Sequence, residues 1–532
     1  MKKGKGLPIC AGVSIGPALV YRKPQQKAGL LCGTPDEEQE KFELACRQAK
    51  KQLVSILRQI SIAVGQEEAA ILEVQLMMLE DPDFTEEVSK KITLGFSATE
   101  AVQATGTQLA QLFLQMDDDY MCARSADILD ISSRVADILL GTKKPSFPDK
   151  PFMLIAEDLS PSETVQLPRE QLLGFIIRRG SSSSHTAILA RILNIPSLVQ
   201  ADIDLEDAAN ATVCAIDGIS GCWYLDPDET TLRTLNAQKQ KVLENQQKLE
   251  QYRSRPTITK AGKQVHLFAN IASVEDAKAA MEGDAEGIGL LRSEFLYLGR
   301  NALPAEEELF AAYQQIALLM QGKPVMIRTL DIGADKQADY LHLPPEENPA
   351  LGLRGLRFCL SHKDIFRTQL RAIYRASHYG NVHIMFPMVV SLWELQEARQ
   401  YCEEVRAELA APRIPIGIMI ETPAAAVMAE QLTRHADFIS VGTNDLTQYT
   451  LAADRQNPHL KRFYDPRHPA VLSLLEHIAK CAGNAGIRAG ICGELGADAT
   501  LTERLIQMGY TTLSLSAGEI LATRKRIFES EV

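Results

Sequence analysis

Eight short apolar segments of strand type recur between residues 265 and 516, and segments with helical spacing separate them. Regular alternation of strands and helices is typical of α/β folds. Eight such units over this length fit a TIM barrel, a fold of typically about 250 residues in which the strands close into a ring. The predicted strands cover residues 265–269, 288–291, 325–327, 382–386, 414–420, 438–441, 488–491 and 512–515.

Polar residues follow most of these predicted strands. Functional groups of TIM barrels lie at the C-terminal ends of the strands, so these residues are expected to share one rim. Guanidinium groups there, with two more arginines on following loops, can clamp phosphate and carboxylate groups. The rim is therefore predicted to bind a small, highly anionic phosphorylated acid. Its members are Asn270, Arg292, Arg328, Asp331, Arg354, Glu421, Asn444, Asp445, Arg455, Cys492 and Glu494.

Two carboxylates of this set, Glu421 and Asp445, come from neighbouring predicted strands. They can supply hard oxygen ligands to a magnesium ion whose other ligands are substrate oxygens and water. A structural interpretation competes for every member, because arginines and carboxylates at strand ends often pair with each other, and a cysteine beside a glycine is commonly buried. The number of strands that end in such residues favours a functional site.

A second feature lies earlier in the chain, where a glycine and four serines at residues 180–184 lead into a helical pattern that begins with His185. The first turn of a helix offers unpaired N–H groups and the positive end of the helix dipole to an anion. Histidine is a competent nucleophile near neutral pH. The loop predicts a histidine that carries a phosphoryl group, with a polar turn of no special function as the alternative.

Composition narrows the class of protein. The net charge of −12 argues against a nucleic-acid partner. The ten cysteines are scattered without a Cys-x-x-Cys pair, which is typical of reduced thiols in a cytoplasm. The basic start lacks the apolar segment of a signal peptide, and no apolar run has the length of a membrane span. We therefore expect a cytoplasmic protein without membrane insertion.

The chain is expected to contain an α/β domain interrupted by helices, followed by a linker and the barrel. Thr34 and Glu37 form a predicted capping box that opens the helical part, and the polar stretch 229–251 reads as a solvated spacer helix. The predicted parts are residues 1–22 with 145–226 around His185, 23–144 as the inserted helical domain, 227–255 as the linker helix, and 256–532 as the barrel.

Five motifs after the His185 loop carry a family resemblance. In order and spacing they resemble enzyme I of the bacterial phosphoenolpyruvate:sugar phosphotransferase system, across essentially the whole chain. The motifs are GIGLLRSEF at residues 287–295, IRTLDIG at 327–333, ETPAAA at 421–426, GTNDLTQY at 442–449 and CGE at 492–494.

The resemblance implies a multidomain α/β fold, with a swivelling phosphohistidine domain, an inserted helical bundle and a C-terminal TIM barrel. It implies that phosphoenolpyruvate binds in the barrel mouth on Mg²⁺ held by Glu421 and Asp445. His185 then takes the phosphoryl group, and Cys492 protonates the enolate of pyruvate. The residues implied to hold the phosphate and carboxylate are Arg292, Arg328, Arg354, Asn444 and Arg455.

The resemblance also implies partners. The inserted helices would dock the histidine-containing carrier protein HPr, and two copies of the chain would form a homodimer through the barrel. Apolar residues 76–79 are either part of that docking surface or part of the core. Relatives commonly have a small residue and a histidine where this chain has Val74 and Gln75, which leaves the identity of the carrier open.

The sequence departs from the family pattern at Ser181 and Ser183 in the histidine loop and at Ala334 in the barrel. The end of the chain at Val532, soon after the last predicted strand, is expected to affect barrel closure and dimer stability. Pyruvate phosphate dikinase and phosphoenolpyruvate synthase are alternatives, but they need an ATP-grasp domain for which this chain has no room. A catalytically weak paralogue that senses phosphoenolpyruvate or the carrier is the non-enzyme alternative.

Overall fold

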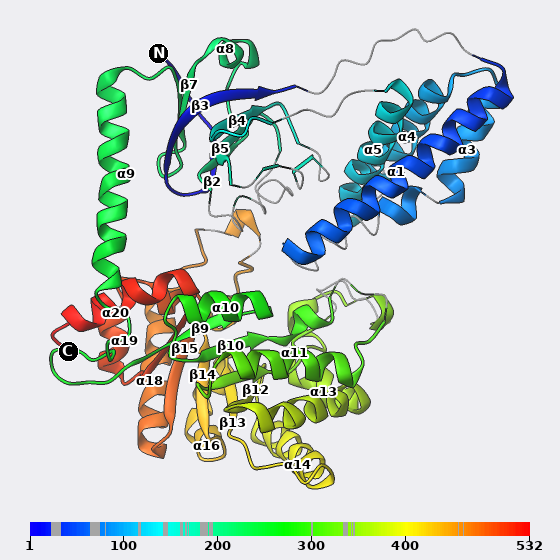
Figure 1. The fold of residues 1–532 in the computed structure, drawn as a ribbon. Helices are drawn as coiled ribbons and strands as arrows, with labels where there is room; N and C mark the ends of the chain where they lie inside the picture. Colours follow the sequence, from blue (N-terminus) through cyan, green and yellow to red (C-terminus); the bar gives the residue numbers. More distant parts are fainter. Residues whose placement is uncertain are drawn as a thin grey trace. The chain divides into compact units, whose positions relative to one another are not determined.

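The computed structural model divides into two compact units, Met1–Asn245 and Gln246–Val532 (Figure 1). His185, Ser181, Ser183 and Ala334 lie outside the residues that it describes. The described residues are 1–22, 33–63, 75–79, 81–114, 119–141, 147–159, 163–164, 167–168, 170–180, 190, 195–298, 300, 302–333, 339–341, 343, 346–455, 457–460 and 462–532.

The first unit contains a sheet with the strand order β1-β8-β7-β3-β4-β5-β6-β2. Strand β3 lies between β7, to which it is antiparallel, and β4, to which it is parallel. Residues 1–22 therefore contribute three strands, β1 to β3, to the same sheet as the later α/β strands. The bounds are β1 Lys2–Lys5, β2 Leu7–Cys10, β3 Val13–Tyr21, β4 Phe152–Ala156, β5 Leu172–Ile177, β6 Ser197–Val199, β7 Val213–Asp217 and β8 Cys222–Leu225, with helix α8 at Leu205–Asn210.

Helices between β3 and β4 lie side by side around their own core (Figure 1). The predicted capping box is present, because Thr34 N–H donates to Glu37 Oε2 at 2.9 Å and Glu37 N–H donates to Thr34 Oγ1 at 3.4 Å. Leu79 is buried in this core, whereas Met77 is 59% exposed, so the segment 76–79 has one face in the core and one on the surface. The bounds are α1 Pro35–Ala63, α3 Pro82–Thr93, α4 Ala98–Leu114 and α5 Asp119–Leu140.

Helix α9, Glu229–Glu250, follows the sheet. Its polar side chains are largely exposed, and Leu235 is its buried residue. This agrees with a solvated spacer helix. In the described parts of the chain, no helix is long and apolar enough to cross a membrane.

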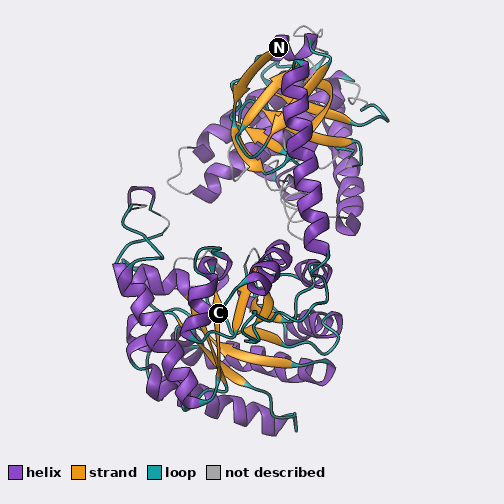
Figure 2. Ribbon diagram, turned by 90° about the vertical axis from the view of Figure 1, so that its left-hand side faces the viewer, coloured by secondary structure: helices purple, strands orange, loops and turns teal. Residues whose placement is uncertain are grey.

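The second unit contains a closed barrel in which every strand pairs in parallel with its neighbours. Figure 2 shows strands of this unit with helices around them. Strand β16 pairs with β9, and Asn270 Nδ2 donates to Ser514 O at 3.1 Å across that seam. The expected disturbance of closure is therefore absent. The strands are β9 His266–Ile271, β10 Ile288–Arg292, β11 Val325–Arg328, β12 Val382–Phe386, β13 Ile416–Ile420, β14 Phe438–Gly442, β15 Arg488–Cys492 and β16 Thr512–Leu515.

Side chains alternate along the barrel strands, because successive residues of a strand point to opposite faces. One set packs inside the ring, where Phe268, Met326, Met419 and Phe438 form a cluster that includes Cys492. The other set packs under the surrounding helices. These are α10 Val274–Glu282, α11 Glu306–Leu319, α12 Leu356–Ser361, α13 Lys363–Ala376, α14 Leu392–Glu408, α15 Pro423–Val427, α16 Ala429–Thr433, α17 Thr443–Leu451, α18 Pro469–Ala485, α19 Thr502–Met508 and α20 Ile520–Glu529.

Candidate active site

The closed parallel barrel brings the C-terminal ends of its strands to one rim. Arg292 and Arg328 end the neighbouring strands β10 and β11 and are register partners. Cys492 ends β15 opposite Gly442, the last residue of β14. Glu421 follows β13, and Asp445 lies in the first turn of α17. These five predicted residues therefore lie at or directly after the C-terminal ends of barrel strands.

Arg328 is buried between two carboxylates. Its Nη2 lies 2.5 Å from Glu294 Oε1, and its Nη1 lies 3.1 Å from Asp331 Oδ2. Burial alone would lower the pKa of Arg328, but these two carboxylates raise it well above its usual range. The guanidinium is therefore a permanent positive charge with a set direction.

Arg354 makes a bidentate pair with the same aspartate. Its Nη2 lies 3.1 Å from both oxygens of Asp331, and its Nη1 donates to the hydroxyl of Tyr449 at 3.4 Å. The same Nη1 is 3.9 Å from Asp445 Oδ1, which links this arginine to one proposed metal ligand. The structural interpretation thus holds in part, because both arginines pair with carboxylates, and these pairs fix the orientation of the two guanidinium groups.

Glu421 has the most unusual environment of the rim. Its Oε1 accepts the backbone N–H of Met388 at 2.6 Å, while its Oε2 is buried without a hydrogen-bond partner among the described residues. Burial, with repulsion from Asp445 and Asp331, raises the pKa of Glu421 to about 8, although Arg328 and Arg354 act against this.

These observations fit a divalent cation. A bound cation, in addition to Arg328 and Arg354, would relieve the repulsion between Glu421 and Asp445 and give Glu421 Oε2 a partner. Gly442 keeps the space beside that oxygen open, because a Cβ there would lie 2.7 Å from Glu421 Oε2. In the described ranges no group of three or more His, Cys, Asp or Glu residues is arranged around a metal position. Two carboxylates suffice for Mg²⁺ when substrate oxygens and water complete its shell.

Cys492 lies inside the barrel just below this rim. Its Sγ donates to Val441 O at 3.3 Å, and 2% of the residue is exposed. Burial raises the pKa of the Cys492 thiol to about 11, with nearby Arg328 and Arg292 opposing the shift. The thiol is therefore protonated at neutral pH and can serve as a proton donor.

The remaining predicted residues lie at the periphery. Arg292 is exposed at the end of β10. Asn444 is half-buried, and its Oδ1 accepts the N–H of Glu494 at 3.4 Å. Arg455 is exposed on the loop after α17, where its backbone N–H donates to Gln448 Oε1 at 3.1 Å.

Gln369, on α13, is a positioning residue that the sequence analysis missed. It is fully buried, and its Oε1 accepts Leu330 N–H at 2.9 Å. Its Nε2 donates to Ser293 Oγ at 2.9 Å and to Tyr313 OH at 3.1 Å. Gln369 thus ties together the loops that carry the two carboxylate partners of Arg328. Its position on the apolar, buried face of α13 was the available signal, because a polar side chain there needs partners.

Family models match nearly all parts of this architecture. The model of the PEP-utilising enzyme, PEP-binding domain, matches residues 246–532. The models of the PEP-utilising enzyme, N-terminal, and of its mobile domain match residues 5–124 and 148–221. The barrel, its rim of arginines and paired carboxylates, and these matches define a PEP-utilising enzyme.

Curated relatives identify the branch within that class. The phosphoenolpyruvate-protein phosphotransferase of Bacillus sp. (strain S) is 39% identical over 98% of this chain and 92% of its own length. The proteins of the same name from Bacillus subtilis (strain 168) and Staphylococcus carnosus (strain TM300) are each 38% identical over 99% of this chain and 94% of their own length. The chain belongs to the phosphoenolpyruvate-protein phosphotransferase family.

Proposed function

We propose that the chain transfers the phosphoryl group of phosphoenolpyruvate to its own His185 and then to the carrier protein HPr, releasing pyruvate, as the first step of the sugar phosphotransferase system. The observation that supports this most directly is the buried rim of Arg328, Arg354, Glu421 and Asp445. It combines fixed positive charges with a carboxylate pair suited to a cation, which is what a phosphorylated acid requires.

Substrate binding is assigned to the arginines and Asn444. Arg328 and Arg354, held by Asp331, would contact the phosphate and carboxylate of phosphoenolpyruvate, with Arg292 and Arg455 closing from the exposed side. Phosphoryl transfer depends mainly on positioning and charge neutralisation rather than on acid–base groups. Because the ion pairs with Asp331 already orient both buried arginines, little reorganisation is needed when the transition state forms.

Glu421 and Asp445 would hold the metal ion, which we propose to be Mg²⁺. When bound, it neutralises charge on the phosphate oxygens. A nitrogen of His185 attacks phosphorus, and the bond between phosphorus and the enol oxygen breaks, which leaves the enolate of pyruvate. The Cys492 thiol gives its proton to the methylene carbon of the enolate, so that pyruvate and a thiolate result.

The division of labour within the chain is part of the proposal. Residues 1–22 and 145–226 would form the phosphohistidine domain, 23–144 the carrier-binding domain, 227–255 the linker helix and 256–532 the phosphoenolpyruvate-binding barrel. We also propose a homodimer through the barrel and a cytoplasmic location. The exposed, polar character of helix α9 supports its proposed role as a spacer between the phosphohistidine domain and the barrel.

Labelling with phosphoenolpyruvate tests this function. Incubation of the wild-type chain with radiolabelled phosphoenolpyruvate and Mg²⁺ should give acid-labile phosphohistidine, and His185→Ala should abolish the label because it removes the acceptor nitrogen. His459→Ala, which removes an exposed histidine, is the control and should be labelled like wild type. Label that persists in His185→Ala would refute the assignment, and absence of label on the wild-type chain would favour the sensor alternative.

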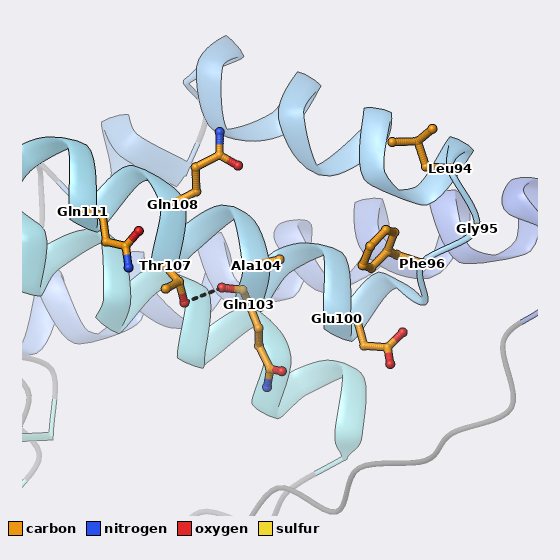
Figure 3. A pocket seen from close by; sticks show the side chains of 9 residues that line it. All are labelled: Leu94, Gly95, Phe96, Glu100, Gln103, Ala104, Thr107, Gln108 and Gln111. Carbon is orange, nitrogen blue, oxygen red and sulfur yellow. Dashed lines mark hydrogen bonds between the residues drawn. The ribbon is translucent and has the colours of Figure 1, made fainter.

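The carrier-docking surface is proposed to include Met77. Its exposed, flexible side chain is of the kind that adapts to partner surfaces. Gln75 is not part of that surface, because it is fully buried and its Nε2 donates to Asp127 Oδ1 at 3.2 Å and Asp130 Oδ2 at 3.0 Å. Two other exposed apolar residues, Leu94 and Phe96, border a hollow of about 700 Å³ beside α4 (Figure 3).

Met77→Ala should slow phosphoryl transfer to HPr by roughly ten-fold while labelling by phosphoenolpyruvate stays unchanged, since about 1.4 kcal/mol of lost apolar contact corresponds to that factor. Transfer is measured by rapid-quench kinetics at limiting HPr. Leu94→Ala removes a comparably exposed apolar side chain on the same helical part and serves as the matched control. Slow transfer in Leu94→Ala with normal transfer in Met77→Ala would contradict docking at Met77 and would instead assign the docking surface to the hollow bordered by Leu94.

A further inference from the structure

Met388 has a left-handed backbone conformation directly beside the proposed metal site. Its φ is +53°, a backbone angle that residues other than glycine, asparagine and aspartate rarely adopt. The residue is buried and follows Pro387 at the end of β12. Such conformations persist only where the surroundings impose them, and they gather at functional sites.

The left-handed conformation has one visible consequence, which is the direction of the Met388 amide. The N–H donates to Glu421 Oε1 at 2.6 Å, a charge-assisted contact when the carboxyl group is ionised. Glu421 Oε2 has no partner in the described part of the chain, and Gly442 leaves the space beside it open. The amide therefore selects which of the two oxygens is engaged by the protein and which is available.

A neighbouring loop supports this conformation. Gly355 has a φ of +58°, and a Cβ placed on it would lie 2.8 Å from Met388 Cβ and 3.3 Å from Asp331 Oδ1. Leu356 N–H donates to Pro387 O at 3.4 Å, which joins the two loops. Gly355 directly follows Arg354, so the close approach of Gly355 to Met388 lies next to the ion pair between Arg354 and Asp331.

We propose that Met388 is a positioning residue of the metal site, whose left-handed backbone holds Glu421 by Oε1 so that Oε2 faces the cation. The inference rests on the proposed function to the extent that Glu421 binds the metal. The proposal gives the backbone N–H of Met388, which is not one of the predicted site residues, a role in orienting Glu421. This role explains why Met388 keeps a strained backbone conformation. Gly355 is the residue that leaves room for this conformation.

The test is the affinity of the full-length chain for Mn²⁺ without phosphoenolpyruvate, measured by electron paramagnetic resonance, with thermal unfolding as the second readout. Met388→Val disfavours the left-handed conformation because its side chain is β-branched, and it should weaken Mn²⁺ binding by about 10- to 100-fold, as is usual for partners of metal ligands. Met388→Gly and Met388→Asn favour that conformation and should bind Mn²⁺ within about two-fold of wild type.

A packing role predicts the opposite order, because valine suits a buried apolar position better than asparagine or glycine. Gln321→Val is the matched control, since Gln321 has a φ of +51° at an exposed position in the turn after α11, and it should lose stability without losing Mn²⁺ affinity. If Met388→Val does not fold, Gly355→Ala is used instead. Its added Cβ would clash with Met388 Cβ and displace the left-handed backbone, so it should weaken Mn²⁺ binding in the same way.

The outcomes separate this inference from the proposed function. Glu421→Gln should abolish Mn²⁺ binding, and wild-type affinity in that variant would overturn the metal site itself. Loss of binding in Glu421→Gln together with normal binding in folded Met388→Val and Gly355→Ala would overturn the positioning role alone. A wild-type chain that binds Mn²⁺ neither alone nor in the presence of phosphoenolpyruvate overturns both.

Discussion

Replacing Arg328 with methionine is expected to lower phosphoryl transfer from phosphoenolpyruvate by about 10²–10³-fold, the usual cost of removing one preorganised group that stabilises transition-state charge. Arg328 is 6% exposed and neutralises both Glu294 and Asp331. Without it, Glu294 and Asp331 each lose one buried ion pair, although Arg354 still contacts Asp331, and this should also reduce the free energy of unfolding by about 3–5 kcal/mol. Rapid-quench labelling of His185 and urea unfolding measure the two effects.

Arg524 provides a matched control in the same barrel unit. It is 1% exposed, pairs with Asp284 and lies 3.5 Å from Glu286, away from the strand-end rim. Arg524→Met should therefore destabilise the barrel to a similar extent while leaving the labelling rate of the folded chain close to wild type. Equal rate losses in the two variants would mean that Arg328 acts through stability alone.

Cys492→Ala should lower the rate of pyruvate formation by about 10²–10⁴-fold, the usual contribution of a positioned proton donor. The KM for phosphoenolpyruvate should change little, because the thiol is inside the barrel and donates to Val441 O rather than to a charged group. Cys402→Ala is the control, since Cys402 is equally buried but on α14. A coupled assay for pyruvate distinguishes the variants, and near-normal turnover in Cys492→Ala would assign the proton to water or another group.

The same residue gives a pH dependence with a defined sign. A donor thiol is active while protonated, and burial raises the pKa of Cys492 to about 11, above the value of about 8.5 for an ordinary thiol. Loss of activity through deprotonation of Cys492 should therefore be centred near pH 11 rather than near pH 8.5. A basic limb centred near 8.5 that disappears in Cys492→Ala would contradict the burial of the donor.

The barrel was predictable because its strands are apolar, bounded by polar residues and separated by helices. Each predicted strand overlaps an observed one. The later start of β13 has a local cause: Pro415 lacks the N–H that a ladder needs, so the strand begins at Ile416. The rim followed from topology, since parallel strands that close into a ring bring their C-terminal ends together.

Other features depend on contacts that periodicity does not encode. Strands β1 and β2 carry lysines and a proline at exposed positions and a glycine at a half-buried one, so the sequence lacks the apolar alternation of a strand. Gln369 and Gln75 are polar residues whose partners lie far along the chain. Met388 acts through its backbone, and the identity of a side chain does not reveal where its N–H points.

The seam between β9 and β16 has a consequence for how the enzyme is made. Thr512 of β16 pairs with His266 of β9, so the first barrel strand to be synthesised cannot complete its pairing until the last strand has been made. Until then the nascent sheet has two open edges, which are prone to pair with other chains, and its closing contact is a slow, long-range one. Rim residues from β10 to β15 are thus all synthesised before the ring that gathers them exists. Catalytic competence should appear in a single late step, without partially active intermediates.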